Sequence, residues 1–343
     1  MAKGIRREGK GVRLKTEGET EDAVLKVENL VTSFDTEIGR IRAVDDVSFE
    51  VQKGEVLGIV GESGCGKSVT ALSVMRLLPK PSGLIENGRI MFSGTNIVDL
   101  PAERMHEIRG NRISMIFQEP MTALNPVHRI GDQIGEVFQL RYSGMSEKEI
   151  SEGSVEILRK VGISDPRKRV EEYPHQISGG MRQRVMIAMA LACKPDILIA
   201  DEPTTALDVT IQAQILELMK QLQAETGMAI IFITHALGVI AETSDRVLVM
   251  YAGKVAETGP VDKIFNKPLH PYTKGLLLSI PRLEGERKKR LHVINGMVPA
   301  LHELPTGCRF RNRCPDAMPV CGTVHPPVSV VENEHLVNCY LYV

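Results

Sequence analysis

A glycine-rich segment in the first quarter of the chain has the residue types and spacing that phosphate binding requires. Residues 61–68 match the phosphate-loop pattern GxxxxGK followed by Ser or Thr. They are Gly61, Glu62, Ser63, Gly64, Cys65, Gly66, Lys67 and Ser68. Glycines let the backbone curl so that its N–H groups point at phosphate oxygens, and a following helix adds a positive field. Lys67 supplies charge to the β- and γ-phosphates, and the Ser68 hydroxyl ligates Mg²⁺. These residues predict binding of a nucleoside triphosphate with Mg²⁺.

Two adjacent carboxylates follow a continuously apolar run at residues 197–200. In phosphoryl transfer one carboxylate can hold Mg²⁺ while another polarises the attacking water. We assign the metal to Asp201 and the general base to Glu202. Such a pair at a strand end can also be a solvated edge, but its distance from residues 61–68 and the stop at Pro203 favour catalysis.

Three further polar segments stand where strands end or a helix begins. The turn of Ser178, Gly179 and Gly180 precedes a helical stretch, which suits anion binding at a helix N-terminus, although a plain N-cap is the alternative. Gln118 and His235 each follow an apolar run that reads as a strand. Either could be structural, but His235 could also contact a γ-phosphate.

In this order the segments resemble the nucleotide-binding subunit of an ABC transporter, over about residues 24–260. The resemblance implies an α/β fold, a P-loop NTPase with a RecA-like core, an antiparallel β subdomain and a helical subdomain at about 104–180. Two such subunits would dock head to tail and trap ATP between one phosphate loop and the other subunit's Ser178 turn. Asp208 would cross that interface. Gln118 would sense the γ-phosphate and approach Mg²⁺, and His235 would clamp the transition state.

Three positions depart from this family pattern or leave a role open. Met181 stands where the signature commonly has Gln, but the backbone and Ser178 carry the anion contact. Ala236 replaces the acidic residue that often follows the His. Phe34 is the nearest candidate for stacking on adenine, and the spacing leaves that role unassigned.

Other segments resemble the peptide-importer branch of this family. They are residues 173–176, 208–212 and 270–273, and the tail after about residue 260 is similar to the extension of dipeptide, oligopeptide and nickel importer ATPases. The resemblance implies a second ATPase subunit, identical or different, two membrane permeases and an extracytoplasmic substrate-binding protein. The chain would sit at the cytoplasmic face of the cell membrane. A nickel or other small-solute importer and a soluble non-transport ATPase remain alternatives, as does a redox-sensing protein with nucleotide control.

Four of the six cysteines lie in the last 36 residues, separated by gaps of five, six and seventeen residues; they are Cys308, Cys314, Cys321 and Cys339. A cytosolic chain should not hold structural disulfides, so free thiols or a metal site remain. Structural zinc usually shows tight Cys-x₂-Cys pairs, which are absent here. The wider spacing suits an iron–sulfur cluster, and the resemblance includes members with one. We therefore expect a 4Fe–4S cluster, with zinc or free thiols as alternatives. Arg309, Arg311 and Arg313 would offset its charge.

Composition places the chain among ordinary globular proteins. It has 343 residues, 43% of them hydrophobic, with 42 Lys and Arg against 43 Asp and Glu, a net charge of −1. A nucleic-acid-binding domain would normally be strongly basic, so no nucleic-acid partner is expected. No apolar run reaches the roughly 20 residues of a membrane-spanning helix, and we expect no secretory signal.

The pattern along the chain predicts three segments. Residues 1–22 carry few large apolar side chains and are expected to be a disordered leader, residues 23–260 the nucleotide-binding domain, and residues 261–343 the C-terminal extension. Short apolar runs at 56–60, 197–200 and 228–234 predict strands of a parallel sheet covered on both faces.

Overall fold

The computed structural model of the chain describes residues 23–118, 123–142, 144–205, 207–280, 292–332 and 334–343. The expected leader at residues 1–22 lies outside the described residues, as does a charged segment at 282–290.

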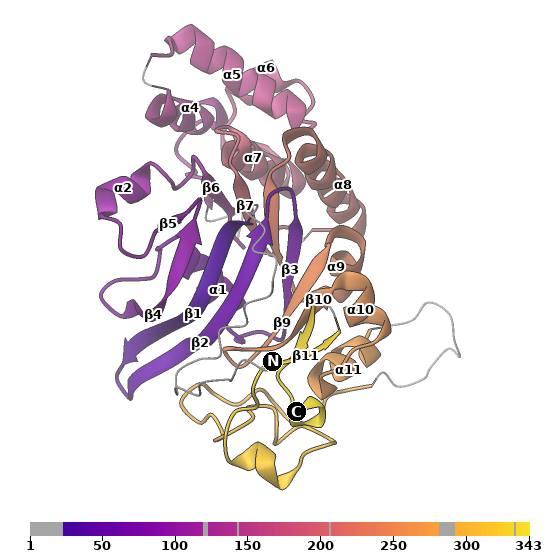
Figure 1. Ribbon diagram of the computed structural model, residues 1–343. Helices are drawn as coiled ribbons and strands as arrows, with labels where there is room; N and C mark the ends of the chain where they lie inside the picture. The colour runs from indigo at the N-terminus through magenta and orange to yellow at the C-terminus, as the bar shows by residue number, and fades with distance from the viewer. Residues whose placement is uncertain (1–22, 119–122, 143, 206, 281–291, 333) are drawn as a thin grey trace, which may run out of the picture.

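The centre of the molecule is an eight-stranded sheet with the order β11-β12-β10-β9-β3-β8-β7-β6 (Figure 1). Its strands are β3 (Val56–Val60), β6 (Ile113–Ile116), β7 (Ile197–Asp201), β8 (Ala229–Ile233), β9 (Arg246–Tyr251), β10 (Lys254–Pro260), β11 (Ser329–Glu332) and β12 (His335–Val337). β6, β7, β8, β3 and β9 run parallel. Every residue of β3, β7 and β8 is buried, which confirms the three strands predicted from continuous apolar runs.

The N-terminal part of the described chain forms a second, antiparallel sheet, in the order β2-β1-β4-β5. Its strands are β1 (Ala23–Thr36), β2 (Gly39–Gln52), β4 (Gly83–Phe92) and β5 (Thr95–Asn96). Val47, Phe49 and Val51 point from β2 into one apolar cluster with Leu57 of β3. The alternation of apolar and polar residues in β2 is what places these three side chains on the same face.

Between β5 and β7 the chain is mostly helical. The helices of this part are α2 (Ala102–His106), α4 (Ile130–Arg141), α5 (Glu147–Lys160), α6 (Pro166–Arg169), the 3₁₀ turn η1 (Pro174–Gln176) and α7 (Gly179–Leu191). Of these, α4, α5 and α6 lie together at one end of the molecule (Figure 1). Ile130, Ile134 and Phe138 are buried on one face of α4, as their spacing predicts. Ser146 and Glu149 form a capping box that starts α5.

The remaining helices cover the sheet and lead into the C-terminal region. They are α1 (Lys67–Val74), α8 (Val209–Thr226), α9 (Leu237–Thr243), α10 (Val261–Asn266) and α11 (Pro271–Leu278). Ile215 of α8 and Ile240 of α9 share an apolar cluster with Phe232 of β8. None of the helices in the described part of the chain is long and apolar enough to cross a membrane.

The end of the chain returns to the central sheet. After irregular segments with the 3₁₀ turn η2 (Pro319–Gly322), β12 pairs antiparallel with β10, and the turn η3 (Tyr340–Tyr342) follows. Buried His335 of β12 has its Nε2 2.7 Å from Oε1 of buried Glu257 of β10. The last residues are therefore built into the sheet that carries the phosphate loop, which the irregular sequence of the tail did not indicate.

Candidate active site

The phosphate loop joins β3 to α1, as the sequence predicts. Gly66 caps α1 with φ +103°, and a Cβ there would lie 2.7 Å from the carbonyl oxygen of Ala43, so a side chain at this position would clash. Lys67 Nζ donates to the carbonyl oxygens of Gly61 at 2.8 Å and Glu62 at 3.1 Å. With only 6% of Lys67 exposed, its ammonium is held inside the curl of the loop.

A hydroxyl and a carboxylate meet beside this loop. Ser68 Oγ donates to Asp201 Oδ1 at 3.1 Å, which links the start of α1 to the end of β7. Burial raises the pKa of Asp201 and the charge of Glu202 adds to that effect, while the Ser68 hydrogen bond opposes it. Hard oxygen ligands of this kind are the ones Mg²⁺ prefers, so the two residues fit the metal that the sequence predicts.

Three polar side chains converge on one carboxylate, two of them from neighbouring strand ends. Gln118 Nε2 donates to Glu202 Oε2 at 3.0 Å, and His235 Nδ1 lies 3.1 Å from Glu202 Oε1. Thr205 Oγ1 also donates to Oε2, at 2.9 Å. Because β6, β7 and β8 are parallel neighbours, their carboxyl ends meet at one sheet edge. The three predicted catalytic residues are thus brought together.

The environment of Glu202 keeps it ionised and strained. Burial alone would raise its pKa, but the hydrogen bonds from His235 and Thr205, with the charges of His235 and Lys67, hold the pKa below its ordinary value. Its backbone adopts φ +48°, a left-handed conformation that is uncommon for a non-glycine residue and is often found at functional sites. A carboxylate held in this way can accept a proton from water.

Ser178 and Asp208 each lie at the N-terminus of a helix, Ser178 at that of α7 and Asp208 at that of α8. Ser178 Oγ accepts a hydrogen bond from Met181 N at 3.3 Å. This capping bond uses the backbone N–H of Met181, so it does not depend on which side chain stands at that position. Asp208 caps α8 through Ile211 N at 3.0 Å. The two starts are close together, because a Cβ on Gly180 would lie 2.9 Å from Cγ2 of Ile211. Ser178, Gly179 and Asp208 are exposed to solvent.

The remaining open position is the aromatic side chain expected to stack on adenine. Phe34 is half-buried in β1, opposite Gly83 of β4 and Ile41 of β2. Its role as a base-stacking residue stays a prediction.

Two residues that contact the phosphate loop were missed by the sequence reasoning. Arg313 pairs with the Glu62 carboxylate, and Tyr272 Oη accepts from Glu62 N at 2.9 Å. They lie 251 and 210 positions along the chain from Glu62, and only the folding of the tail against β9 brings them there. Arg313 is expected from the sequence to offset the charge of a cluster, but it pairs with Glu62 instead.

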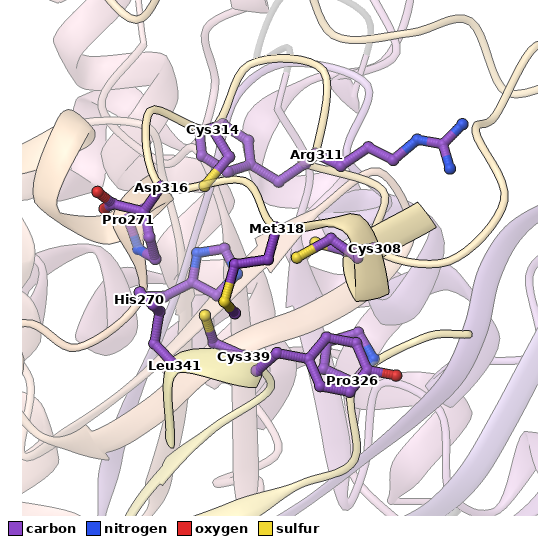
Figure 2. A pocket seen from close by; sticks show the side chains of 13 residues that line it. His270, Pro271, Cys308, Arg311, Cys314, Asp316, Met318, Pro326, Cys339 and Leu341 are labelled. Atoms are coloured by element: carbon purple, nitrogen blue, oxygen red, sulfur yellow. The ribbon is translucent and has the colours of Figure 1, made fainter. Parts of the chain in front are cut away.

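The four tail cysteines line one small cavity but do not form a metal site. Figure 2 shows Cys308, Cys314 and Cys339 around this cavity with Met318, and Cys321 also lines it. Its volume is about 10 Å³, the room of one water molecule. Burial raises the pKa of the Cys314 thiol to about 11. Burial also raises the pKa values of the Cys308 and Cys339 thiols.

The prediction of a 4Fe–4S cluster is therefore wrong. Among the residues that the structure describes, no group of three or more His, Cys, Asp or Glu side chains is placed to hold a metal ion. The same finding removes the zinc alternative for the described tail. All six cysteines are free thiols. Spacing along an irregular segment could suggest a shared ligand set, but it could not fix where the sulfur atoms point.

The sequence matches two protein families along its length. Residues 44–205 match the family ABC transporter, and residues 256–321 match the family oligopeptide/dipeptide transporter, C-terminal region. The dipeptide transport ATP-binding protein DppD of Bacillus subtilis (strain 168) is 55% identical over 320 residues, covering 93% of this chain and 95% of that protein. The oligopeptide transport ATP-binding protein AppD of the same organism is 51% identical over 319 residues, covering 93% and 97%.

Solved structures agree with these relatives. A dimeric ATP-binding cassette in a post-hydrolysis state, bound to ADP and Pi, has a TM-score of 0.63 and 28% identity, covering 69% of this chain and 98% of that one. A cassette from Clostridium perfringens, part of an ABC transporter complex, has a TM-score of 0.60 and 28% identity, covering 72% and 92%. The predicted ABC ATPase fold is confirmed. The chain belongs to the ATP-binding proteins of the ABC transporter family and is an ATPase.

Proposed function

We propose that this chain is the ATP-hydrolysing subunit of an importer for dipeptides or oligopeptides. The peptide substrate is supported by the names of the relatives and by the match of residues 256–321 to a peptide-transporter region. The hydrolytic role is carried by one observation above all. Gln118 and His235 both contact the carboxylate of Glu202. Glu202 is the residue that follows Asp201, whose carboxylate contacts Ser68.

Each residue of this group has a distinct task in hydrolysis. The loop N–H groups and Lys67 bind the phosphates, and Ser68, Asp201 and Gln118 would hold Mg²⁺. When bound, Mg²⁺ offsets the negative charge of the β- and γ-phosphates. Glu202 accepts the proton of the attacking water, because its hydrogen bonds keep it ionised. His235 orients that carboxylate and is exposed enough to reach the γ-phosphate.

The Ser178 turn and Asp208 are assigned to the second subunit's nucleotide. Both are exposed helix starts, and helix N-termini attract anions. The one polar contact described for Ser178 Oγ is to its own helix, which leaves the outer face of the turn available to a partner. We assign two membrane permeases and an extracytoplasmic substrate-binding protein as the other partners, and the cytoplasmic face of the membrane as the location.

Reconstitution tests this proposal. The chain, co-expressed with two permeases and any companion ATPase encoded with them, is purified and placed in lipid vesicles with the binding protein. A dipeptide such as dialanine should raise ATP hydrolysis and accumulate in the vesicles. Nickel uptake without peptide uptake would overturn the substrate assignment. Failure of the chain to associate with any permease would overturn the transport role itself.

A further inference from the structure

An arginine from the C-terminal region forms an ion pair with a residue of the phosphate loop. The Arg313 guanidinium makes a two-pronged ion pair with Glu62, with Nη1 2.6 Å from Oε2 and Nη2 3.0 Å from Oε1. Bidentate pairs of this kind are the strong, geometrically defined ones. The Arg313 side chain is 5% exposed and that of Glu62 30%, so the pair is shielded rather than a loose surface contact.

Other groups hold Arg313 in this position. Its Nε donates to the carbonyl oxygen of Asn295 at 3.0 Å, and Nη1 reaches Tyr251 Oη at 3.4 Å. The guanidinium carbon lies 5.7 Å from the centre of the Tyr251 ring and 6.0 Å from that of Phe310. A planar guanidinium fixed by stacking and several hydrogen bonds loses little freedom when it binds a carboxylate.

The backbone of Glu62 is held from the same side. Tyr272 of α11 is fully buried, and its hydroxyl accepts from Glu62 N at 2.9 Å. Its ring packs 4.7 Å from Tyr251 and 5.4 Å from Phe310, measured between centroids, and the latter two lie 5.1 Å apart. This aromatic cluster joins β9, α11 and the tail beneath the loop. Both the side chain and the backbone of Glu62 are therefore held by residues beyond 250.

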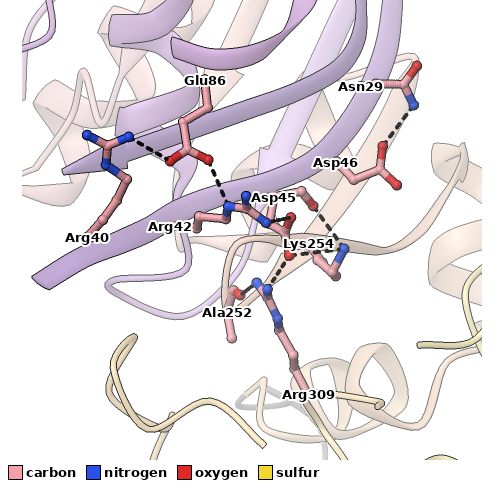
Figure 3. Close-up of polar contacts among 9 residues, drawn as sticks. All are labelled: Asn29, Arg40, Arg42, Asp45, Asp46, Glu86, Ala252, Lys254 and Arg309. Atoms are coloured by element: carbon pink, nitrogen blue, oxygen red, sulfur yellow. Dashed lines mark hydrogen bonds and ion pairs between the residues drawn. The ribbon is translucent and has the colours of Figure 1, made fainter. Parts of the chain in front are cut away.

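A second arginine ties the tail to segments that pack against the loop. Arg309 pairs with Asp45 and donates to the carbonyl oxygen of Ala252, while Lys254 Nζ lies 3.2 Å from Asp45 Oδ2 (Figure 3). The backbone N–H of Gly253 donates to the carbonyl oxygen of Cys65 at 2.9 Å, within the loop itself. The tail thus contacts the loop directly and also braces the segments packed against it.

The Glu62 carboxylate poses an electrostatic problem for phosphate binding. It belongs to the loop whose N–H groups and Lys67 must attract a multiply charged anion, and a nearby unpaired negative charge would repel that anion. Arg313 neutralises this charge and fixes the residue next to Gly61. If the Arg313–Glu62 ion pair served only to attach the tail, removing both charges together would not restore the affinity for phosphate.

We propose that Arg313 is a positioning residue for nucleotide binding, and that through Glu62 the C-terminal region sets the affinity of the phosphate loop for the triphosphate. This inference rests on the proposed binding of phosphates by residues 61–68. It gives the tail a role in the ATP site of the same chain.

The test compares charge variants of the full-length chain by equilibrium binding of a fluorescent ATP analogue with Mg²⁺. Arg313→Gln should raise Kd about tenfold, because Glu62 is left unpaired in the loop. The double variant Glu62→Gln with Arg313→Gln removes both charges and should recover most of that affinity. A double variant as weak as Arg313→Gln, or a single variant within twofold of the parent, would overturn the inference.

Controls separate this effect from unfolding and from the proposed function. Arg311→Gln removes an arginine of the same segment, bonded to Thr306 and Gly322, and should leave Kd within twofold. Lys67→Ala should abolish binding, and parent-like binding by it would instead overturn the assignment of the loop. Should Arg313→Gln fail to fold, Arg313→Lys keeps the charge but loses the fork and should raise Kd about threefold, and an unchanged Kd would overturn the inference.

Discussion

Gln118 Nε2 lies 3.0 Å from Glu202 Oε2, although 84 positions separate the two residues. The contact exists because β6 and β7 are adjacent parallel strands whose ends open at the same edge. The residue proposed to sense the γ-phosphate and the residue proposed to activate water are therefore in direct contact. A movement of Gln118 would therefore alter a hydrogen bond to the proposed catalytic carboxylate.

Replacing Glu202 by Gln should separate hydrolysis from binding. Turnover should fall by about 10²–10⁴-fold, the usual scale for losing a general base, because an amide cannot accept the proton of water. Binding of MgATP, measured by equilibrium titration, should stay within about threefold, since Lys67 and Ser68 are untouched. The matched control is Glu217→Gln on the exposed side of α8, expected at parent activity. Near-normal steady-state turnover by Glu202→Gln would remove Glu202 from its role.

Replacing His235 by Ala should slow hydrolysis without weakening binding. The carboxylate of Glu202 would lose one oriented hydrogen bond to a ring nitrogen, so kcat should fall roughly 10–100-fold, as expected for a charge-assisted bond. KM for ATP should change little because the imidazole is not part of the phosphate loop. A rise in the KM for ATP as large as the expected fall in kcat, with kcat itself unchanged, would mean that His235 contributes to ATP binding instead.

Hydrolysis should require two subunits. Ser178→Arg should abolish turnover yet leave ATP binding to the isolated chain intact, because the turn serves the partner's nucleotide. If the chain acts as a homodimer, mixing Ser178→Arg with Lys67→Ala should restore activity, since one of the two sites then has an intact loop and an intact turn. With a companion ATPase, each variant is paired with that subunit instead. A monomeric preparation, verified by light scattering, with full activity would contradict the prediction.

Acid should destabilise the fold through His270. Burial, with added repulsion from His325 and Lys274, lowers the pKa of His270 from 6.5 to about 3, and its Nδ1 accepts from Tyr272 N at 3.0 Å. Below pH 6.5 the unfolded chain takes up a proton that the folded chain refuses, so the free energy of unfolding falls as pH drops. The loss from this one residue should reach about 2 kcal/mol at pH 5.

The variant that checks this is His270→Asn, which keeps an N-cap acceptor but cannot titrate. Urea unfolding at pH 7 and pH 5 should show a smaller difference between the two pH values for the variant than for the parent. Equal differences would mean that other groups cause the acid sensitivity.

The cysteine thiols of the tail should react slowly in the folded protein. Burial raises the pKa values of Cys308, Cys314 and Cys339, and only the thiolate attacks a disulfide reagent. Labelling with an aromatic disulfide at pH 7.5 should be slow for these residues, and all six cysteines should react at once in denaturant. Rapid labelling of the folded tail would show that the cavity opens freely.

Local sequence patterns were sufficient for the core strands and the phosphate loop. The loop pattern requires particular residues at consecutive positions, so its geometry follows from the chain itself, as the φ of Gly66 shows. The buried strands β3, β7 and β8 were predicted because a strand covered on both faces must be apolar throughout. The grouping of Gln118, Glu202 and His235 was predictable once those strands were known to be parallel neighbours.

The conformation of the tail depends on tertiary contacts that the sequence does not indicate. Its irregular segments carry no periodicity, so the pairing of β12 with β10 and the orientation of the four thiols could not be inferred from spacing. In the sequence nothing distinguishes Arg313 from Arg309 and Arg311, which lie in the same segment. Its role depends on a two-pronged contact with Glu62 across 251 positions, which exists only because the aromatic residues of β9, α11 and the tail pack together beneath the loop. Long-range packing of this kind leaves no local pattern in a single sequence.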